Sequence, residues 1–165
     1  MDLYILRHAI AESHSAPKPD SQRRLTLDGA QKMRRIAKGM KALDLKFDLI
    51  LSSPYLRARE TAEIVAKTFG CEKALKLSPA LAADGNPKEL IEELKHKYRR
   101  EKRVVLVGHE PYLSNLVSLL LSGHTDISVN LKKGGLCSLT IAELHYGRCA
   151  TLEWLLTPAQ MRCLK

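Results

Sequence analysis

The sequence predicts an α/β fold in which a mostly parallel sheet is covered by helices on both faces. Apolar runs typical of strands alternate with helical patterns along the 165 residues, and strands that are separated by helices need crossover connections between parallel neighbours. A folded chain of this length buries roughly 70% of its unfolded surface, enough for one core without disulfides or metal. We therefore expect a single domain over residues 1–165, built as a three-layer α/β/α sandwich.

The first part of the chain carries two strand patterns with a capped helix between them. Leu3–Leu6 is a short apolar run that predicts a buried strand. Thr26 favours a helix over Leu27–Leu43 because its hydroxyl can accept a hydrogen bond from a free amide of the first turn. Asp48–Ser52 predicts the second strand.

Two further helices are predicted from their start signals. Ser53–Pro54 supplies an N-cap and a first-turn proline for a helix that ends at Phe69, directly before a glycine. Asn86–Pro87 is again a cap followed by a first-turn proline, and Glu89 stands at the third position of a capping box. This second signal predicts a helix that ends near Lys97.

The remaining chain contains the clearest strand pattern, one more helix and then two segments with few helix signals. Val104–Val107 is a fully apolar strand pattern, and a helix is predicted to start at Pro111 and to stop near Gly123. Leu136–Ala142 and Thr151–Leu156 carry few helix signals and predict two strands. The glycines expected in the turns around them are Gly134, Gly135 and Gly147.

The chain is basic, with 27 Lys and Arg against 18 Asp and Glu and a formal net charge of +9. Much of this charge lies in two segments, which contain Lys32, Arg34, Arg35, Lys38 and Lys41, and Lys95, Lys97, Arg99, Arg100, Lys102 and Arg103. A basic surface can bind nucleic acid, but no nucleic-acid-binding motif accompanies either segment. We interpret the two basic segments as solvated helix faces and helix ends and not as a nucleic-acid site. Binding of an acidic protein partner is a further role for the same positive charge.

We expect neither a membrane-spanning segment nor a metal site. The longest apolar stretch, Leu116–Leu121, already contains a serine and is far shorter than about 18 residues. The N-terminus lacks the pattern of a signal peptide, so we expect a cytoplasmic protein that keeps its N-terminus. Reduced thiols are the expected state of the four cysteines, which form no C-x-x-C and no zinc-finger spacing with histidine. They are Cys71, Cys137, Cys149 and Cys163.

Chemically active side chains follow three of the predicted strands. The first strand leads into Arg7 and His8, the second into Ser52–Ser53 and shortly Arg57, and the third into His109. In an open α/β sheet, ligands bind outside the carboxyl ends of the strands. Each residue alone would be an ordinary hydrogen-bonded histidine or helix-face cation, but their joint placement predicts one site.

This set of side chains fits an oxyanion, phosphate above all. Guanidinium groups match phosphate oxygens bidentately and stay charged near neutrality. Neighbouring cations disfavour the imidazolium, so we expect His8 to be neutral, with a lone pair able to attack phosphorus. We expect His109 to donate a hydrogen bond to the transferring group, and each well-aimed donor of this kind is worth about 3 to 4 kcal/mol.

Three blocks of the sequence resemble the signature blocks of the histidine phosphatase (phosphoglycerate mutase-like) superfamily. In chain order they are Leu6-Arg7-His8-Ala9, Ser52-Ser53-Pro54-Tyr55-Leu56-Arg57-Ala58-Arg59-Glu60-Thr61-Ala62 and Val107-Gly108-His109-Glu110-Pro111. The resemblance covers the whole chain and is strongest to the small SixA-type phosphohistidine phosphatase branch. It implies a phosphoglycerate mutase-like fold.

The resemblance also implies roles for individual residues. His8 would take the phosphoryl group, and Arg7, Arg57 and His109 would clamp it, with no metal or other cofactor. Arg23-Arg24-Leu25-Thr26 followed by Gly29 is similar to an R-x-L-T-x-x-G stretch of the small branch. This would bring Arg23 to the rim of the pocket as a substrate-binding residue, and the alternative is a solvated cation on a polar loop.

Two departures from the family pattern affect the chemistry. Ala9 follows the nucleophile where many relatives have glycine, which implies a negative φ at that position or a slightly different turn. The glutamate with which many relatives protonate an alcohol leaving group has no clear counterpart. Asp84 is the best candidate for this proton donor, and the alternative is a turn residue before the Asn86 cap.

The leading hypothesis for function is therefore a phosphatase that hydrolyses phosphohistidine on a phosphotransfer or carrier protein. The short chain leaves little room for a lid, so the pocket should accept a residue on the surface of another protein. An imidazole also departs from phosphorus more readily than an alkoxide. The alternatives are a small-molecule phosphomonoester phosphatase with Asp84 as the acid and a phosphoprotein-binding module without turnover, with a mutase ranked below them.

Overall fold

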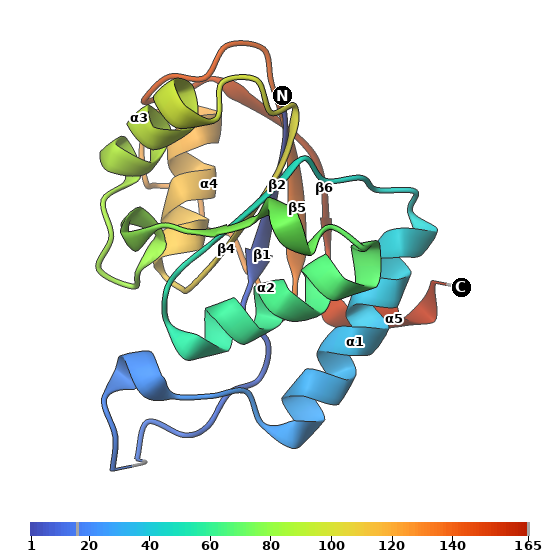
Figure 1. Cartoon of the computed structure of the whole chain (residues 1–165). Coiled ribbons are helices and arrows are strands. Elements are labelled where there is room, and N and C mark those ends of the chain that lie inside the picture. The colour runs from blue at the N-terminus through green and yellow to red at the C-terminus, as the bar shows by residue number, and fades with distance from the viewer. Residues whose placement is uncertain (16, 165) are drawn as a thin grey trace.

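The computed structural model describes residues 1–15 and 17–164 as a central sheet with helices on both faces (Figure 1). The strands are β1 (Asp2–Arg7), β2 (Leu49–Ser52), β3 (Leu75–Leu77), β4 (Arg103–Gly108), β5 (Leu136–Ile141) and β6 (Ala150–Leu156). The α-helices are α1 (Leu27–Ala42), α2 (Leu56–Phe69), α3 (Pro87–Lys97), α4 (Tyr112–Ser122) and α5 (Pro158–Cys163), and the short 3₁₀ helices are η1 (Asp20–Gln22), η2 (Glu72–Ala74) and η3 (Pro79–Leu81).

The sheet has the strand order β3-β2-β4-β1-β5-β6. The four strands from β3 to β1 are parallel, and β5 runs antiparallel to both of its neighbours. The register pairs Leu6 with Val107 and Ser52 with Val107, so β1, β2 and β4 end at the same level. This confirms the mostly parallel sheet and places the segments that follow these strands at one edge.

Two hydrophobic cores, one on each face of the sheet, hold the layers together. Side chains alternate along a strand, so Leu3 and Ile5 of β1 face the core under α3 and α4 while Tyr4 and Leu6 face the core under α1, α2 and α5. These four side chains are buried. Burial on both faces explains the nearly continuous apolar runs of the central strands.

Most helix signals of the sequence act as expected. The Thr26 side chain accepts a hydrogen bond from the Gly29 amide at the start of α1. Gly70 and Gly123 end α2 and α4 in the left-handed conformation, with φ of 66° and 88°. A glycine adopts this conformation without the steric cost that a β-carbon adds.

The predicted start of α2 is wrong. The helix begins at Leu56, and its N-cap is Tyr55, whose side chain makes no capping bond. The Ser53 hydroxyl instead lies 2.7 Å from the His109 imidazole and accepts a longer bond from the Tyr55 amide. The hydroxyl that the local pattern assigned to a helix cap thus makes a tertiary contact with His109, which follows β4.

The capping box predicted for α3 is also wrong in part. Asn86 caps the helix by accepting a bond from the Lys88 amide, as expected. The Glu89 carboxylate, however, accepts a bond from the Asn86 side-chain amide at 3.4 Å, whereas a capping box requires a bond from the Asn86 backbone amide.

No helix of residues 1–15 and 17–164 has the length and apolar character that a bilayer crossing requires. The four cysteines of this part of the chain carry free thiols. Several cations of the two basic segments are paired with acids on the same helix, for example Lys32 with Asp28 and Lys97 with Glu93.

Candidate functional site

Four predicted residues lie at the sheet edge where β1, β2 and β4 end. Arg7 is the last residue of β1 and His8 follows it, His109 follows β4, and Arg57 stands in the first turn of α2. We call these four residues the strand-end cluster. Its two imidazoles and Arg57 are almost fully buried, with exposed fractions of 6% for His8, 1% for His109 and 3% for Arg57.

The hydrogen bonds of His8 define its protonation state. Its Nδ1 lies 2.7 Å from the Ala9 carbonyl oxygen, which can only accept. Its Nε2 receives a hydrogen bond from Nε of Arg57 at 3.2 Å, and a guanidinium can only donate. His8 is therefore a neutral imidazole with hydrogen on Nδ1 and a lone pair on Nε2. This is the form that a nucleophile requires.

The electrostatic surroundings favour the same form. Burial, together with the neighbouring His109, Arg57 and Arg7, lowers the pKa of His8 to about 3, although the bond to the Ala9 carbonyl acts in the opposite direction. Ala9 itself is tied down, because its amide donates to the Thr61 hydroxyl of α2 at 3.1 Å. Of the non-glycine residues that the structure describes, Asp44 has a positive φ and Ala9 does not, as expected.

His109 lies beside His8, with ring centroids 5.2 Å apart. Its Nε2 is 2.7 Å from the Ser53 hydroxyl. Burial lowers the pKa of His109 to about 4, and the Arg57 guanidinium acts in the same direction. Both imidazoles are therefore neutral at neutral pH.

Neutral, buried imidazoles make the stability of the protein depend on pH. The unfolded chain binds protons at a histidine pKa of about 6.5, whereas folded His8 and His109 remain neutral down to about 3 and 4. Stability is therefore lost as the pH falls from 6.5 toward 4, by up to about 1.4 kcal/mol per pH unit for each imidazole. Urea unfolding at pH 6.5 and 5 should show this slope. The His8→Ala variant should show a smaller one, and an unchanged slope in that variant would contradict the buried neutral state.

Arg7 is held by the loop that precedes β5. Its Nη1 donates to the Leu131 carbonyl at 2.9 Å, and the Gly134 amide bonds to the Arg7 carbonyl at 3.0 Å. Gly134 has a φ of 77°, a conformation that favours glycine.

Arg7 Nε and His109 Nδ1 are buried and have no hydrogen-bond partner among the described residues. Such atoms are rare and occur at functional sites.

Arg57 and Arg23 are joined by a residue that the sequence analysis missed. Asp20, in η1, accepts bonds from Arg57 Nη2 at 2.8 Å and from Arg23 Nε at 2.7 Å. Arg23 is buried, with 6% of its surface exposed, so the alternative of a solvated loop cation is wrong. Its Nη1 donates to the Glu12 carbonyl at 2.6 Å. Arg23 thus lies beside the strand-end cluster, and Asp20 connects the two.

Asp84 lies at the periphery of the cluster. The Tyr55 hydroxyl donates to the Asp84 carboxylate at 3.5 Å, and the Tyr55 ring lies 5.0 Å from the His109 ring. The Gly85 amide bonds to the Ala82 carbonyl, so Asp84 also stands in a turn. The geometry is compatible with both alternatives for Asp84, proton donor and turn residue.

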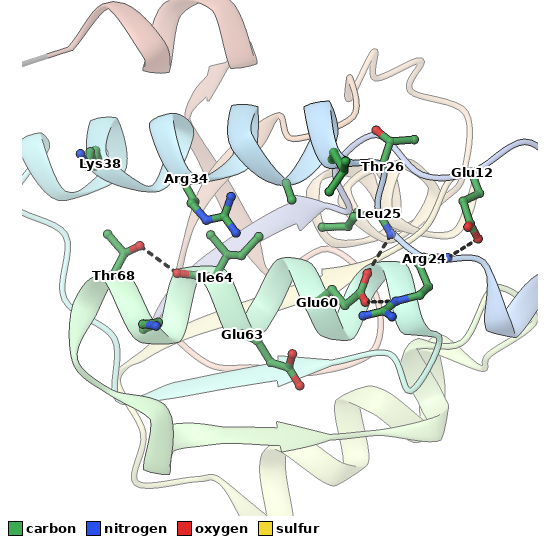
Figure 2. A pocket seen from close by; sticks show the side chains of 13 residues that line it. Glu12, Arg24, Leu25, Thr26, Arg34, Lys38, Glu60, Glu63, Ile64 and Thr68 are labelled. Carbon is green, nitrogen blue, oxygen red and sulfur yellow. Dashed lines mark hydrogen bonds and ion pairs between the residues drawn. The ribbon is translucent and has the colours of Figure 1, made fainter.

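A groove lies between α1 and α2, and no residue of the strand-end cluster lines it (Figure 2). It measures about 830 Å³ and is lined by Glu12, Arg24, Leu25, Thr26, Leu27, Ala30, Arg34, Lys38, Glu60, Glu63, Ile64, Lys67 and Thr68. The Glu60 carboxylate accepts bonds from the Leu25 amide and from Arg24 Nε. Through these two bonds, Glu60 of α2 anchors the chain segment that carries Arg23.

Within residues 1–15 and 17–164, no three His, Cys, Asp or Glu side chains form a potential metal site.

Comparisons with known proteins agree with this geometry. The model of the histidine phosphatase superfamily (branch 1) matches residues 3–82. An uncharacterised protein of Picosynechococcus sp. (strain PCC 7002) is 35% identical over 146 residues, which is 84% of each chain. The phosphohistidine phosphatase SixA of Escherichia coli K12 is 27% identical and aligns over 100% of this chain and 99% of its own. The solved structure of the protein histidine phosphatase SixA complexed with tungstate superposes with a TM-score of 0.82 at 25% identity, covering 98% of this chain and 99% of that one.

Proposed function

Because the chain belongs to the histidine phosphatase superfamily, whose members are phosphatases, we propose that it hydrolyses phosphohistidine on a protein through a covalent intermediate at His8. The observation that carries this proposal is the lone pair of a neutral, buried imidazole held beside a guanidinium. Arg57 Nε lies 3.2 Å from His8 Nε2, so an anion bound to Arg57 comes within reach of the nucleophile.

The first step transfers the phosphoryl group to the enzyme. His8 Nε2 attacks phosphorus in line, a new N–P bond forms, and the N–P bond to the substrate imidazole breaks. The leaving imidazole keeps the bonding electrons and takes a proton from solvent. Arg7, Arg57 and His109 hold the three equatorial oxygens, and Arg23 contributes positive charge at the rim. Positioning and charge neutralisation supply most of the catalysis in such a transfer.

The second step regenerates His8. A water molecule attacks the phosphorus of phospho-His8, the N–P bond breaks, and inorganic phosphate leaves with the oxygen of that water. His8 Nε2 recovers its lone pair, and the Ala9 carbonyl keeps the hydrogen on Nδ1 throughout the cycle. The fixed tautomer ensures that the same nitrogen attacks in every turnover.

A protein-bound phosphohistidine is the favoured substrate for two reasons. Leaving imidazoles make small demands on a general acid, and the candidate acid Asp84 contacts Tyr55 and lies outside the strand-end cluster. The E. coli relative is a phosphohistidine phosphatase, and the structure with tungstate is that of a protein histidine phosphatase. We also propose that the protein acts in the cytoplasm as part of signal transduction and needs no metal.

The contact between Tyr55 and Asp84 favours one alternative, a phosphatase of small phosphomonoesters in which Asp84 protonates an alkoxide. An Asp84→Asn change separates the two functions. We expect it to lower kcat/KM for a sugar phosphate by about 100-fold, since general acids contribute factors of this order, and to leave the hydrolysis of a phosphohistidine peptide within a factor of about three. Parallel assays of wild type and variant give both ratios, and equal losses on the two substrates would contradict the phosphohistidine assignment.

A further inference from the structure

Asp20 occupies hydrogen-bond donors of Arg57 that a bound phosphoryl group would need. The Oδ2 atom of Asp20 accepts from Arg57 Nη2 at 2.8 Å, and the backbone carbonyl of Asp20 accepts from Arg57 Nη1 at 2.6 Å. The remaining nitrogen of this guanidinium, Nε, donates to His8. All three nitrogens of Arg57 are thus engaged by His8 and Asp20. Oδ1 of Asp20 engages Arg23 as well.

Carboxylate and phosphate oxygens bind a guanidinium in the same way. A phosphoryl group in reach of His8 Nε2 must therefore compete with Asp20 for Arg57. The two partners of this ion pair differ in their freedom to move. The Arg57 side chain is 4% exposed and fixed in the first turn of α2, whereas the Asp20 side chain is 42% exposed. Asp20 is therefore the partner that can turn into solvent.

We propose that Asp20 is an internal anion of the active site that leaves Arg57 when a phosphoryl group binds and returns when phosphate departs. The proposal rests on the proposed function for the identity of the ligand. Asp20 lowers the affinity of the site for phosphate, because part of the binding free energy is spent on displacing it. It also helps product release, because a charged replacement for phosphate is available within the same chain.

A positioning role for Asp20 predicts the opposite effect. If Asp20 only holds Arg57 and Arg23 in place, its loss disorders the arginines and weakens phosphate binding. If it competes, its loss strengthens binding. The sign of the change therefore decides between the two roles.

The test is the affinity for inorganic phosphate at pH 7.5, measured by titration calorimetry on wild type, Asp20→Asn and Asp20→Ser. We expect both variants to bind about tenfold more tightly, since each loses a charge-assisted competitor. The matched control is Glu12→Gln. Glu12 carries the same charge on the same segment, and its side chain bonds to Lys18 and to the Arg24 amide. The control should change the affinity less than twofold, although it removes one negative charge as well.

Each outcome has a defined meaning. A gain in both Asp20 variants that clearly exceeds the gain in the control supports the proposal. An unchanged or weaker affinity in the Asp20 variants, or an equal gain in the control, overturns it and leaves the proposed function standing. If neither wild type nor the Asp20 variants bind phosphate, the proposal and the proposed function both fail.

Discussion

Replacing His8 by alanine is expected to reduce kcat on a phosphohistidine substrate by about 10⁴-fold or more, since a covalent mechanism loses its first step without the nucleophile. The side chain that is removed is the neutral imidazole whose Nε2 faces Arg57. The other buried imidazole of the described chain is His109, whose Nε2 contacts Ser53 and not Arg57. Steady-state release of inorganic phosphate from a phosphohistidine peptide measures the loss.

The control for this variant is His96→Ala. His96 is an exposed histidine of α3 that pairs with Glu92, so its loss should leave kcat within a factor of about two, as for most surface substitutions. Addition of a chelator to the wild type should leave the rate unchanged. A His8→Ala variant that keeps most of the wild-type rate, or a rate that depends on divalent metal, would contradict the mechanism.

Replacing Arg57 by alanine is expected to lower kcat/KM by about 10³-fold, the order of effect of an arginine that stabilises charge in phosphoryl transfer. Arg57 is a buried cation that contacts both His8 Nε2 and the Asp20 carboxylate. Arg57→Lys should recover only a small part of the rate, because a lysine offers a point charge and no planar fork. The same phosphate-release assay measures both variants.

Arg59→Ala is the matched control for Arg57, since Arg59 lies on the same helix but is exposed and pairs with Glu63. Its kcat/KM should stay near the wild-type value. Melting temperatures of the three variants separate a catalytic loss from a folding defect. A folded Arg57→Ala variant with a rate close to that of Arg59→Ala would contradict the role of Arg57.

The parts of the fold that the sequence predicted are those with local signals. Thr26 caps α1 because its hydroxyl accepts a hydrogen bond from an amide of the first turn. Gly70 and Gly123 end α2 and α4 because glycine adopts the left-handed conformation there. The strands that lie in the centre of the sheet were found because burial on both faces makes them apolar throughout. These effects do not depend on distant parts of the chain.

Among the strands and α-helices, two elements were missed for different reasons. The strand β3 (Leu75–Leu77) has three residues, two of them exposed, and exists through its pairing with β2, so no local pattern marks it. The helix α5 (Pro158–Cys163) did have a signal, since Thr157 and Gln160 form a capping box around a first-turn proline. Its single buried side chain, Met161, packs into the core under α1 and α2.

The candidate site likewise has residues that the sequence could predict and one that it could not. The topology of a parallel sheet gathers the residues at the ends of β1, β2 and β4, so the approach of His8, Arg57 and His109 could be inferred from sequence order alone. Asp20 could not be inferred. It contacts Arg57, which is 37 residues away, because the segment before α1 folds back over the cluster, and one aspartate in a polar loop carries no distinguishing pattern.

The most direct test of the mechanism is the chemical identity of the phosphorylated residue during turnover. The enzyme is mixed with a ³²P-labelled phosphohistidine peptide, quenched in base within one turnover, digested and analysed by mass spectrometry. The account predicts an acid-labile, base-stable phosphoryl group on the peptide that contains His8. Release of phosphate with no labelled enzyme, or with the label on a serine, a carboxylate or another histidine, would contradict it.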